Sequence, residues 1–308
     1  MHPVVYYVIV GKILGRLGRL RNQLSRFKNE ARTASGSSKP TNHRQFFKEK
    51  LQALLGDFPK NLTDALDGEE QRLVMDDAEA TLRHQFDYLG SGRVTLDPID
   101  WHTDFKNHYT WPWRLFYLKY RHDAGSDIKV PWELSRSHHL LWCGEAWLLT
   151  GERRFAAEVI DEISDWIDEN PYRYSVNWTC AMDTAIRAVN WMYALHMIEG
   201  APSFTEDAAK KIYRSLFLHG CFIADNLEKH FPYSNNHYAS DLAGLLFLGE
   251  LFAHTSTGKR WLKFAIPDFW DEIRREVLPS GVHFEKSVSY HRLMTEMFGY
   301  TFLMLRRL

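Results

Sequence analysis

The sequence predicts an all-α protein, and two features of the chain support this class. Apolar residues recur at helical spacing in successive segments from His138 onward, and short turns rich in Gly, Pro, Ser and Asn separate these segments. The strict alternation of apolar and polar residues that is typical of strands is scarce. With 308 residues, 45% of them hydrophobic, the chain is long enough to bury one large helical core or two smaller ones.

The first 45 residues are expected to stand apart as a basic helix followed by a linker. Apolar residues at helical spacing, with Lys and Arg between them, predict the helix: Leu14, Leu17, Leu20, Leu24 and Phe27. Such a helix either packs on its own domain or lies on a membrane surface. The linker, Asn29 to Gln45, is rich in Ser, Thr, Gly and Asn.

Residues 46–308 are predicted to form a helical domain that is truncated at its C-terminal end, because its last helix runs to the final residue. Thr205 and Ser234 are the predicted N-caps of two helices, Gly200 is a predicted C-cap, and Pro267 is expected to interrupt another helix. The segment 88–118 favours loops, with room for short strands. The expected helices are 46–89 with a break at 56–61, His138–Leu149, Arg154–Glu169, Cys180–Glu199, Glu206–Lys229, Asn235–Ala253, Gly258–Leu278 and Lys286–Leu308.

A weak internal repeat indicates how these helices are ordered. GEAWLLTGERRF, from Gly144, resembles GELFAHTSTGKRWLKF, from Gly249, and the two Gly-Glu pairs are 105 residues apart. In both segments a helix ends near Thr-Gly, and an aromatic residue opens the next helix. About two helical hairpins fit into this separation, which predicts stacked hairpins in a solenoid or a closed toroid.

The composition excludes several classes of function. A net charge of −1 gives no general attraction to nucleic acid. No run approaches the roughly 18 apolar residues that a membrane-spanning helix needs. Neither the 15 histidines nor the three cysteines show the spacing of a metal or disulfide site, so no metal or cofactor is expected and the thiols should be buried: Cys143, Cys180 and Cys221. The 11 Trp and 14 Tyr suit either a sugar-binding cleft or a large helical core.

The stretch FPYSNNHYASDLAGLLFLG places three polar residues where a helix begins. Ser234 is the expected cap, and Asn235 could share that task. Asn236 and His237 then lie in the first turn, beside the positive end of the helix, where amide and imidazole groups can bind a carboxylate. The alternative is a doubly capped helix with a solvated histidine.

A second candidate site lies early in the last helix, where Tyr290, His291 and Arg292 are adjacent. A tyrosine has an unperturbed pKa of about 10, but it can act as a base or an acid if cations or hydrogen-bond donors stabilise its phenolate. The alternative is that Tyr290 is a core residue whose hydroxyl has a structural partner.

Two more polar groups are candidates for binding substrate. Trp132, Glu133 and Arg136 precede a helix that is expected to start near Ser137. In the Cys180–Glu199 helix, a polar stripe occupies one face at i, i+4 and i+7 with Trp178 nearby: Asp183, Arg187 and Asn190. The alternative for this stripe is a surface ion pair between its acid and its arginine.

Four segments of the chain resemble, in the same order, the heparinase II/III-type polysaccharide lyases: KVPWELSRSHHLLWCGEAWLLTGERRF, VNWTCAMDTAIRAVNW, SNNHYASDLAGLLFLG and FEKSVSYHRLMTEMFGY. The resemblance covers roughly Asp87 to Leu308. It implies an incomplete (α/α) toroid, followed in the family by a β-sandwich that this chain does not reach. It also implies β-elimination of an acidic polysaccharide and a periplasmic or secreted location. Because the basic N-terminal residues follow the apolar stretch instead of preceding it, a cytoplasmic location stays open.

The resemblance implies a role for each of three residues. Asn236 neutralises the substrate carboxylate with the support of His237, and Tyr290, 54 residues after Asn236, moves protons. A further family histidine comes from beyond the toroid, so this chain by itself is expected to lack one part of the site. At lower priority, the substrate-binding residues are Trp132, Glu133, Arg136, Trp178, Asp183, Arg187 and His291.

Other classes of function stay open at this point. An (α/α)-barrel glycoside hydrolase needs two carboxyl groups that flank the glycosidic bond, and no pair stands out among the acids available: Glu133, Asp183, Asp241 and Glu285. A toroid that binds glycans without cleaving them is the alternative that is not an enzyme. A helical scaffold for proteins fits less well, because the polar and aromatic motifs cluster. The sequence does not indicate an oligomeric state.

Overall fold

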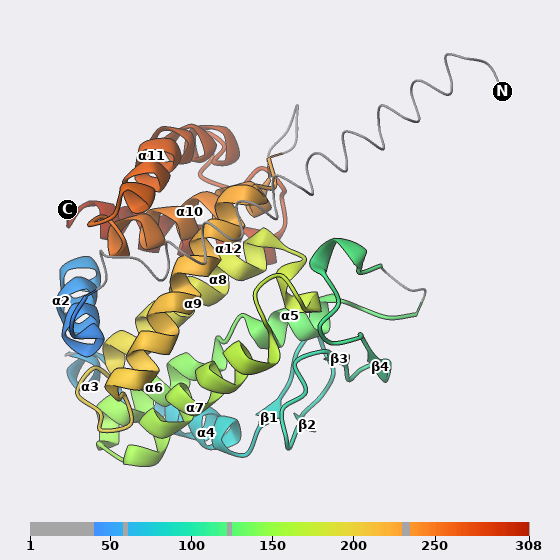
Figure 1. Ribbon diagram of the computed structural model, residues 1–308, viewed down its shortest axis with the longest axis vertical. Helices are drawn as coiled ribbons and strands as arrows, with labels where there is room; N and C mark the ends of the chain where they lie inside the picture. Colours follow the sequence, from blue (N-terminus) through green and yellow to red (C-terminus); the bar gives the residue numbers. More distant parts are fainter. Residues whose placement is uncertain (1–39, 58–60, 122–124, 230–234, 308) are drawn as a thin grey trace. The chain divides into compact units, whose positions relative to one another are not determined.

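The computed structural model describes residues 40–57, 61–121, 125–229 and 235–307 (Figure 1). The predicted N-terminal basic helix, most of the predicted linker and Ser234 lie outside these ranges. Helix α2 begins at His43, so the last three residues of the predicted linker are helical. No helix in the described ranges is both long and apolar enough to cross a membrane.

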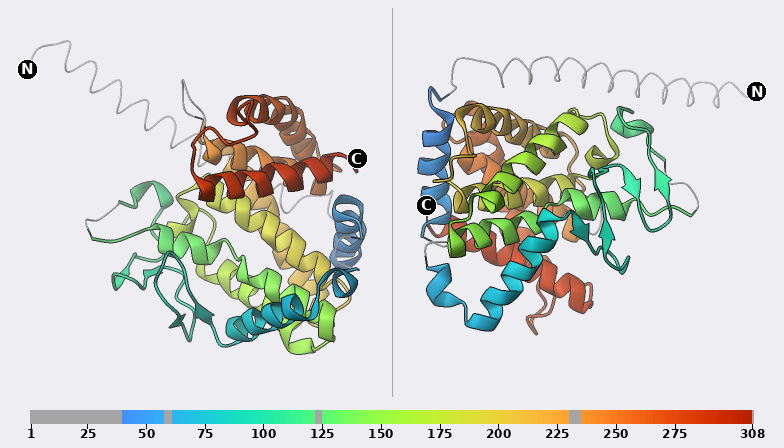
Figure 2. Two further views of the ribbon diagram at one scale, coloured as in Figure 1. Left: turned by 180° about the vertical axis from the view of Figure 1, so that it is seen from behind. Right: turned by 90° about the horizontal axis from the view of Figure 1, so that it is seen from below.

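The described part of the chain is mainly helical, which confirms the all-α class (Figure 2). Its helices are α2 (His43–Leu55), α3 (Leu62–Ala65), α4 (Gly68–Leu82), α5 (Lys129–Ser135), α6 (His139–Thr150), α7 (Arg153–Glu169), α8 (Ala181–Met197), α9 (Glu206–Asp225), α10 (Asn236–Leu251), α11 (Ser256–Glu276) and α12 (Val288–Leu305). Short 3-10 helices cover Tyr117–Lys119 and Val176–Trp178.

Two small antiparallel ribbons form in the segment where loops and short strands are predicted. One pairs β1 (Gln85–Phe86) with β2 (Val94–Thr95), and the other pairs β3 (Thr103–Asp104) with β4 (Tyr109–Thr110). Both ribbons are only two residues long, so they contribute little to the core. The ribbon β3–β4 packs against α5 and the ribbon β1–β2 against α4 (Figure 1).

The helices form a partial toroid of hairpins, as predicted. Helices α6–α7, α8–α9 and α10–α11 are successive hairpins, and both copies of the sequence repeat fall at hairpin turns. Helices α6, α8, α10 and α12 pack side by side as an inner layer, whereas α7 and α9 pack on its outside (Figure 1). Helices α8 and α10 are almost completely buried on all sides, as expected for central helices.

The inner helices run in the same direction, because each hairpin reverses the chain. Two contacts between α6 and α8 confirm this direction. Ser137, just before α6, accepts a hydrogen bond from Trp191, and further along both helices Gly144 lies against Met197, so the residue numbers increase together. Helices α8 and α10 approach so closely that a Cβ atom on Gly244 would lie 2.5 Å from the Cβ of Ala185. The N-terminal ends of the inner helices therefore face one end of the array.

Several details of the predicted helices are wrong. The helix predicted to reach Leu89 ends at Leu82, and Gln85–Phe86 form strand β1 instead. The N-cap of α10 is Asn235 and not the predicted Ser234. Helix α9 ends at Asp225, four residues before the predicted Lys229. Pro267 does not interrupt α11, which continues through it because flanking residues such as Ala265 and Phe269 anchor that helix in the core. Helix α8 ends at Met197 with Ile198 as its C-cap, so Gly200 is not a cap.

The inner helices enclose a pocket of about 90 Å³, where a carboxyl group sits among largely apolar side chains. Burial raises the pKa of Glu145, at this pocket, to about 7. Between about pH 4.5 and 7 the Glu145 carboxyl thus keeps its proton in the folded state and releases it in the unfolded chain. The free energy of unfolding therefore decreases as the pH rises through this range.

We therefore expect Glu145→Gln to raise the free energy of unfolding by about 1 to 2 kcal/mol above about pH 8, and to change it little below about pH 4.5. Urea unfolding at both pH values measures the difference. An equal effect of the substitution at both pH values would contradict the prediction.

Candidate active site

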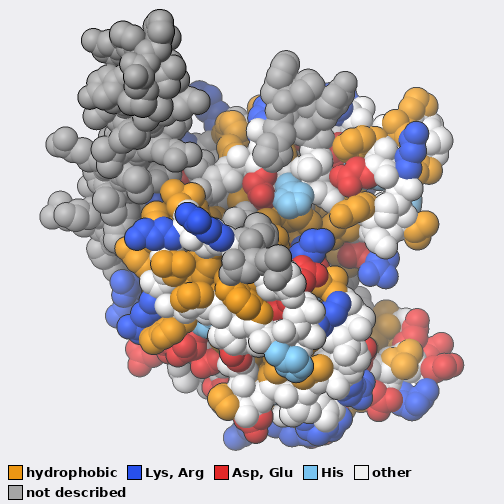
Figure 3. Space-filling model, turned by 90° about the vertical axis from the view of Figure 1, so that its right-hand side faces the viewer, with side chains coloured by type: hydrophobic (Ala, Val, Ile, Leu, Met, Phe, Trp, Pro, Cys, Tyr) orange, Lys and Arg blue, Asp and Glu red, His pale blue; other side chains and the backbone are white. Residues whose placement is uncertain are grey.

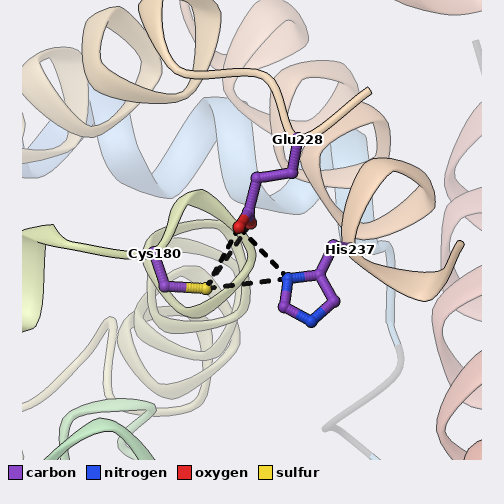
Figure 4. A group of neighbouring side chains, drawn as sticks. All are labelled: Cys180, Glu228 and His237. Atoms are coloured by element: carbon purple, nitrogen blue, oxygen red, sulfur yellow. Dashed lines mark hydrogen bonds and ion pairs between the residues drawn. The ribbon is translucent and has the colours of Figure 1, made fainter. Parts of the chain in front are cut away.

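The beginnings of α8 and α10 bring together residues that are far apart in the sequence. Cys180 precedes α8, His237 lies in the first turn of α10, and Glu228 belongs to the segment between α9 and α10 (Figure 4). The helix dipole makes such helix starts favourable for anions. Figure 3 views the side on which α5 and the ribbon β3–β4 lie, and it shows basic, acidic and histidine side chains close together among hydrophobic ones.

The first turn of α10 presents Asn236 with its side chain unengaged. Asn235 is the N-cap, and its side chain accepts a hydrogen bond from the backbone N–H of His237 at 3.2 Å. Asn236 is only 3% exposed, and its carbonyl accepts a bond from Ser240. The Asn236 amide group forms no hydrogen bond within the described ranges, so its donor is available to a ligand.

His237 is oriented by Glu228. Its Nδ1 lies 3.2 Å from Glu228 Oε1, and this hydrogen bond raises the pKa of the imidazole. Glu228 is itself fixed, because its Oε2 accepts a bond from Met182 N at 2.9 Å and its own N–H donates to Asp241. The raised pKa favours the charged imidazolium, which suits binding of a carboxylate.

Arg136 lies at the junction of α5 and α6, held between two carboxylates. Its Nε donates to Asp183 Oδ1 and its Nη1 to Glu133 Oε1, both at 2.6 Å. Asn190 also contacts this arginine, by donating to its backbone carbonyl. Burial is the main cause of a raised pKa at Glu133, and Arg136 opposes it. Asp183 therefore positions Arg136, and the alternative of a surface ion pair with Arg187 is wrong.

Arg187 does not face a ligand, contrary to the prediction. Its side chain has no exposed surface, and its guanidinium carbon lies 3.9 Å from the centre of the Trp166 ring. Its Nε donates to His219 Nε2 at 3.0 Å, and burial lowers its pKa to about 9. The sequence places Arg187 on the same face as Asp183, but α8 is buried on all sides, so this part of the stripe packs into the core.

Trp178 is also a core residue rather than a platform for sugar. It is 2% exposed, and its Nε1 donates to the carbonyl of Asn170 at 3.0 Å. One edge of the ring borders a pocket of about 380 Å³ between α7 and α9, which none of the other predicted site residues line. Trp132 remains partly exposed, with its Nε1 bonded to Val176 O and Thr179 Oγ1 at 3.1 Å each.

Tyr290 lies near the start of α12 and is 44% exposed. It shares a helix face with Leu293 and Met297, at i+3 and i+7, and these two residues pack against the cluster of Cys180, Met182 and Ile186. This face turns Tyr290 toward the start of α8. His291 is less available, because its Nδ1 accepts a bond from the backbone N–H of His283 at 3.4 Å.

The sequence does not indicate that three residues of this region lie together. Cys180 is predicted to be a buried thiol, Glu228 falls within the predicted last turn of α9, and Asp241 lies on a mainly apolar helix. They meet because α9 ends early and the chain turns back to α10. Spacing along the sequence could not have found this contact.

Known proteins similar to this chain share its architecture. The model of the family Heparinase II/III N-terminus matches residues 19–307. A curated heparin-sulfate lyase from Pedobacter heparinus is 24% identical over 267 residues, which are 82% of this chain and 36% of that protein. The crystal structure of heparan sulfate lyase HepC from the same organism superposes with a TM-score of 0.60 at 21% identity, covering 86% of this chain and 39% of that one. A heparinase III crystal structure superposes with a TM-score of 0.51 at 16% identity, covering 76% and 34%.

Proposed function

The chain belongs to the heparinase II/III family, whose N-terminal model it matches almost from end to end, and from this premise we propose that it cleaves a uronic-acid-containing polysaccharide by β-elimination. One observation at the start of α10 supports the proposal most strongly. The side-chain amide of Asn236, which forms no hydrogen bond within the described ranges, lies next to the imidazole of His237, which Glu228 holds in place. The chain spans little more than a third of the length of the relatives it matches.

The first step of elimination is the removal of the proton at C5 of the uronate, next to the carboxylate. Negative charge then builds up on a group that is already anionic. Donors that are fixed in advance stabilise this charge, and Asn236 is such a donor, on a buried and capped helical turn. His237, whose pKa is raised by Glu228, adds positive charge at the same place.

We assign both proton transfers of the elimination to Tyr290. As a base it takes the C5 proton; the C4–C5 double bond forms as the bond between C4 and the glycosidic oxygen breaks, and as an acid the tyrosine returns the proton to the departing oxygen. A single tyrosine can perform both tasks where the proton and the leaving group lie on the same side of the sugar. Tyr290 suits this role because it is half-exposed and its helix face is turned toward the start of α8.

The likeness to heparin-sulfate lyase makes a heparan-type glycosaminoglycan the first substrate to test, with alginate and other polyuronates beside it. Such substrates lie outside the cytoplasm, so we propose a periplasmic or secreted location. Protease accessibility in intact cells would test the location independently of activity.

The four acids considered for a hydrolase do not form a suitable pair in the described part of the structure. Glu133 and Asp183 both bind the same guanidinium of Arg136, so neither flanks an open space for a water molecule. Asp241 is fully buried, and Glu285 accepts a bond from the backbone N–H of Asn236. Binding without cleavage is the stronger rival, because the relatives carry almost two thirds of their length outside the matched region.

The test is to incubate the chain with each polyuronate and to follow the ultraviolet absorbance of the unsaturated uronate product. Tyr290→Phe removes one hydroxyl group, and we expect the absorbance rise to fall at least about 100-fold. Tyr300→Phe is the matched control, since Tyr300 is also half-exposed on α12 but lies three turns further along the helix.

Each outcome of this test has a definite meaning. An unchanged rate in Tyr290→Phe would contradict the assignment of the base. New reducing ends without ultraviolet absorbance would indicate hydrolysis. Retention on a heparan-type affinity column without any product would support a binding module.

A further inference from the structure

Three side chains of different chemistry place ligand atoms around one point at the starts of α8 and α10 (Figure 4). Cys180 Sγ lies 3.8 Å from Glu228 Oε1 and 3.9 Å from His237 Nδ1, and the latter two atoms are 3.2 Å apart. Thiolate, carboxylate and imidazole are the donors that zinc prefers in proteins.

These separations match the edges of a tetrahedral zinc site. Zinc binds sulfur at about 2.3 Å and histidine nitrogen or carboxylate oxygen at about 2.0 to 2.2 Å, which places neighbouring ligand atoms about 3.6 Å apart where sulfur is involved and about 3.3 Å apart otherwise. Each observed distance lies within about 0.3 Å of these values. Little movement of the side chains would be needed to receive an ion.

We propose that Cys180, Glu228 and His237 form a site for one divalent cation of the zinc class, with the fourth coordination position open. A site with three protein ligands and an open position is the arrangement of reactive rather than purely structural zinc. The open side faces away from Cys180, which is 2% exposed, and toward the histidine, whose side chain is 37% exposed.

The charge balance around the cluster favours a cation. Asp183, Glu228 and Asp241 gather here, whereas Arg136 is the neighbouring arginine and is already shared between Asp183 and a second carboxylate. Asp241 has no exposed surface, and its Oδ1 has no hydrogen-bond partner among the residues that the structure describes. A divalent cation would offset this excess of negative charge.

A second layer of contacts keeps the carboxylate ligand in place. Glu228 Oε2 accepts a hydrogen bond from Met182 N at 2.9 Å and lies 3.5 Å from Cys180 Sγ, while Oε1 faces His237 Nδ1 at 3.2 Å. The backbone N–H of Glu228 is tied to Asp241 at 2.7 Å. Outer contacts of this kind orient metal ligands and contribute to their affinity.

The inference goes beyond the proposed lyase function and does not depend on it. Nδ1 of His237 is the atom used, so Nε2 of the same ring stays free for a substrate. If both proposals hold, Nδ1 of His237 gives up its proton to bind the ion, and the ion, one residue from Asn236, replaces the imidazolium as the positive charge that meets an anionic group of the polysaccharide.

Co²⁺ is the probe for the test, because a cysteine thiolate bound to Co²⁺ produces a ligand-to-metal charge-transfer band in the near ultraviolet. We expect the metal-free chain to develop this band with one Co²⁺ per chain, and Zn²⁺ to displace it. Cys180→Ser should abolish the band. Cys143→Ser and Cys221→Ser are matched controls that should retain it, since those thiols are buried elsewhere in the fold.

Glu228→Gln provides a second variant that keeps the thiol and the shape of the side chain. Loss of a direct ligand should weaken Zn²⁺ binding at least as much as loss of an outer contact does, which is about 10- to 100-fold. Binding without a charge-transfer band, a band that persists in Cys180→Ser, or no binding at all would each overturn the proposal. None of these readouts requires catalytic activity.

Discussion

Asn236→Ala is expected to lower the rate of unsaturated-uronate formation by a factor of about 100 to 1,000, the usual cost of losing one donor that stabilises a developing anion. The Asn236 side chain forms no hydrogen bond within the described ranges, and its carbonyl stays bonded to Ser240 in the variant. The free energy of unfolding should therefore change little. Initial rates measured by ultraviolet absorbance, together with a thermal melt, check both statements.

Asn235→Ser is the matched control for this experiment. It changes the neighbouring asparagine at the same helix end, and serine caps a helix about as well as asparagine does. We expect its rate to stay within a few-fold of the parent chain. Equal losses in the two variants would mean that the helix start as a whole is needed, and Asn236 would lose its special role.

Asp183→Asn is expected to lower the free energy of unfolding by about 2 to 4 kcal/mol, because it removes the charge from one partner of a buried ion pair. Asp183 is 1% exposed, and its Oδ1 accepts from Arg136 Nε at 2.6 Å. The arginine would then keep one carboxylate partner, Glu133, instead of two. The midpoint of urea unfolding measures the change.

Asp271→Asn makes the same chemical change in an exposed pair with Arg274, whose N–O distance is 2.8 Å. Pairs of this kind contribute about 0 to 1 kcal/mol. The comparison therefore separates burial from ion pairing as the source of the effect. Similar losses at Asp183 and Asp271 would contradict the assignment of Asp183 as a buried anchor for Arg136.

Local sequence chemistry predicted much of the fold. Periodic apolar residues predicted helices such as α7 and α10 to within two residues at each end, and Thr205 was the correct N-cap of α9. The repeat at Gly144 and Gly249 predicted the hairpin order. These features depend on interactions within a few residues of one another, which is why a single sequence reveals them.

Packing between helices decided what the side chains do, and the sequence could not supply it. Asp183 and Arg187 lie on one helix face, yet the former binds Arg136 and the latter packs against Trp166, because α8 is surrounded by other helices. Whether a polar residue reaches solvent depends on its neighbours in space.

The sequence by itself determined the helical class, the hairpin order and the cluster of polar residues at the start of α10, since each follows from short-range patterns. Only the tertiary structure decided that Cys180 and Glu228 meet His237. Glu228 lies 48 residues from Cys180, and the two meet because the chain leaves α9 early and returns to α10 beside the start of α8. A contact of that kind is fixed by the direction and packing of whole helices, which no local pattern encodes.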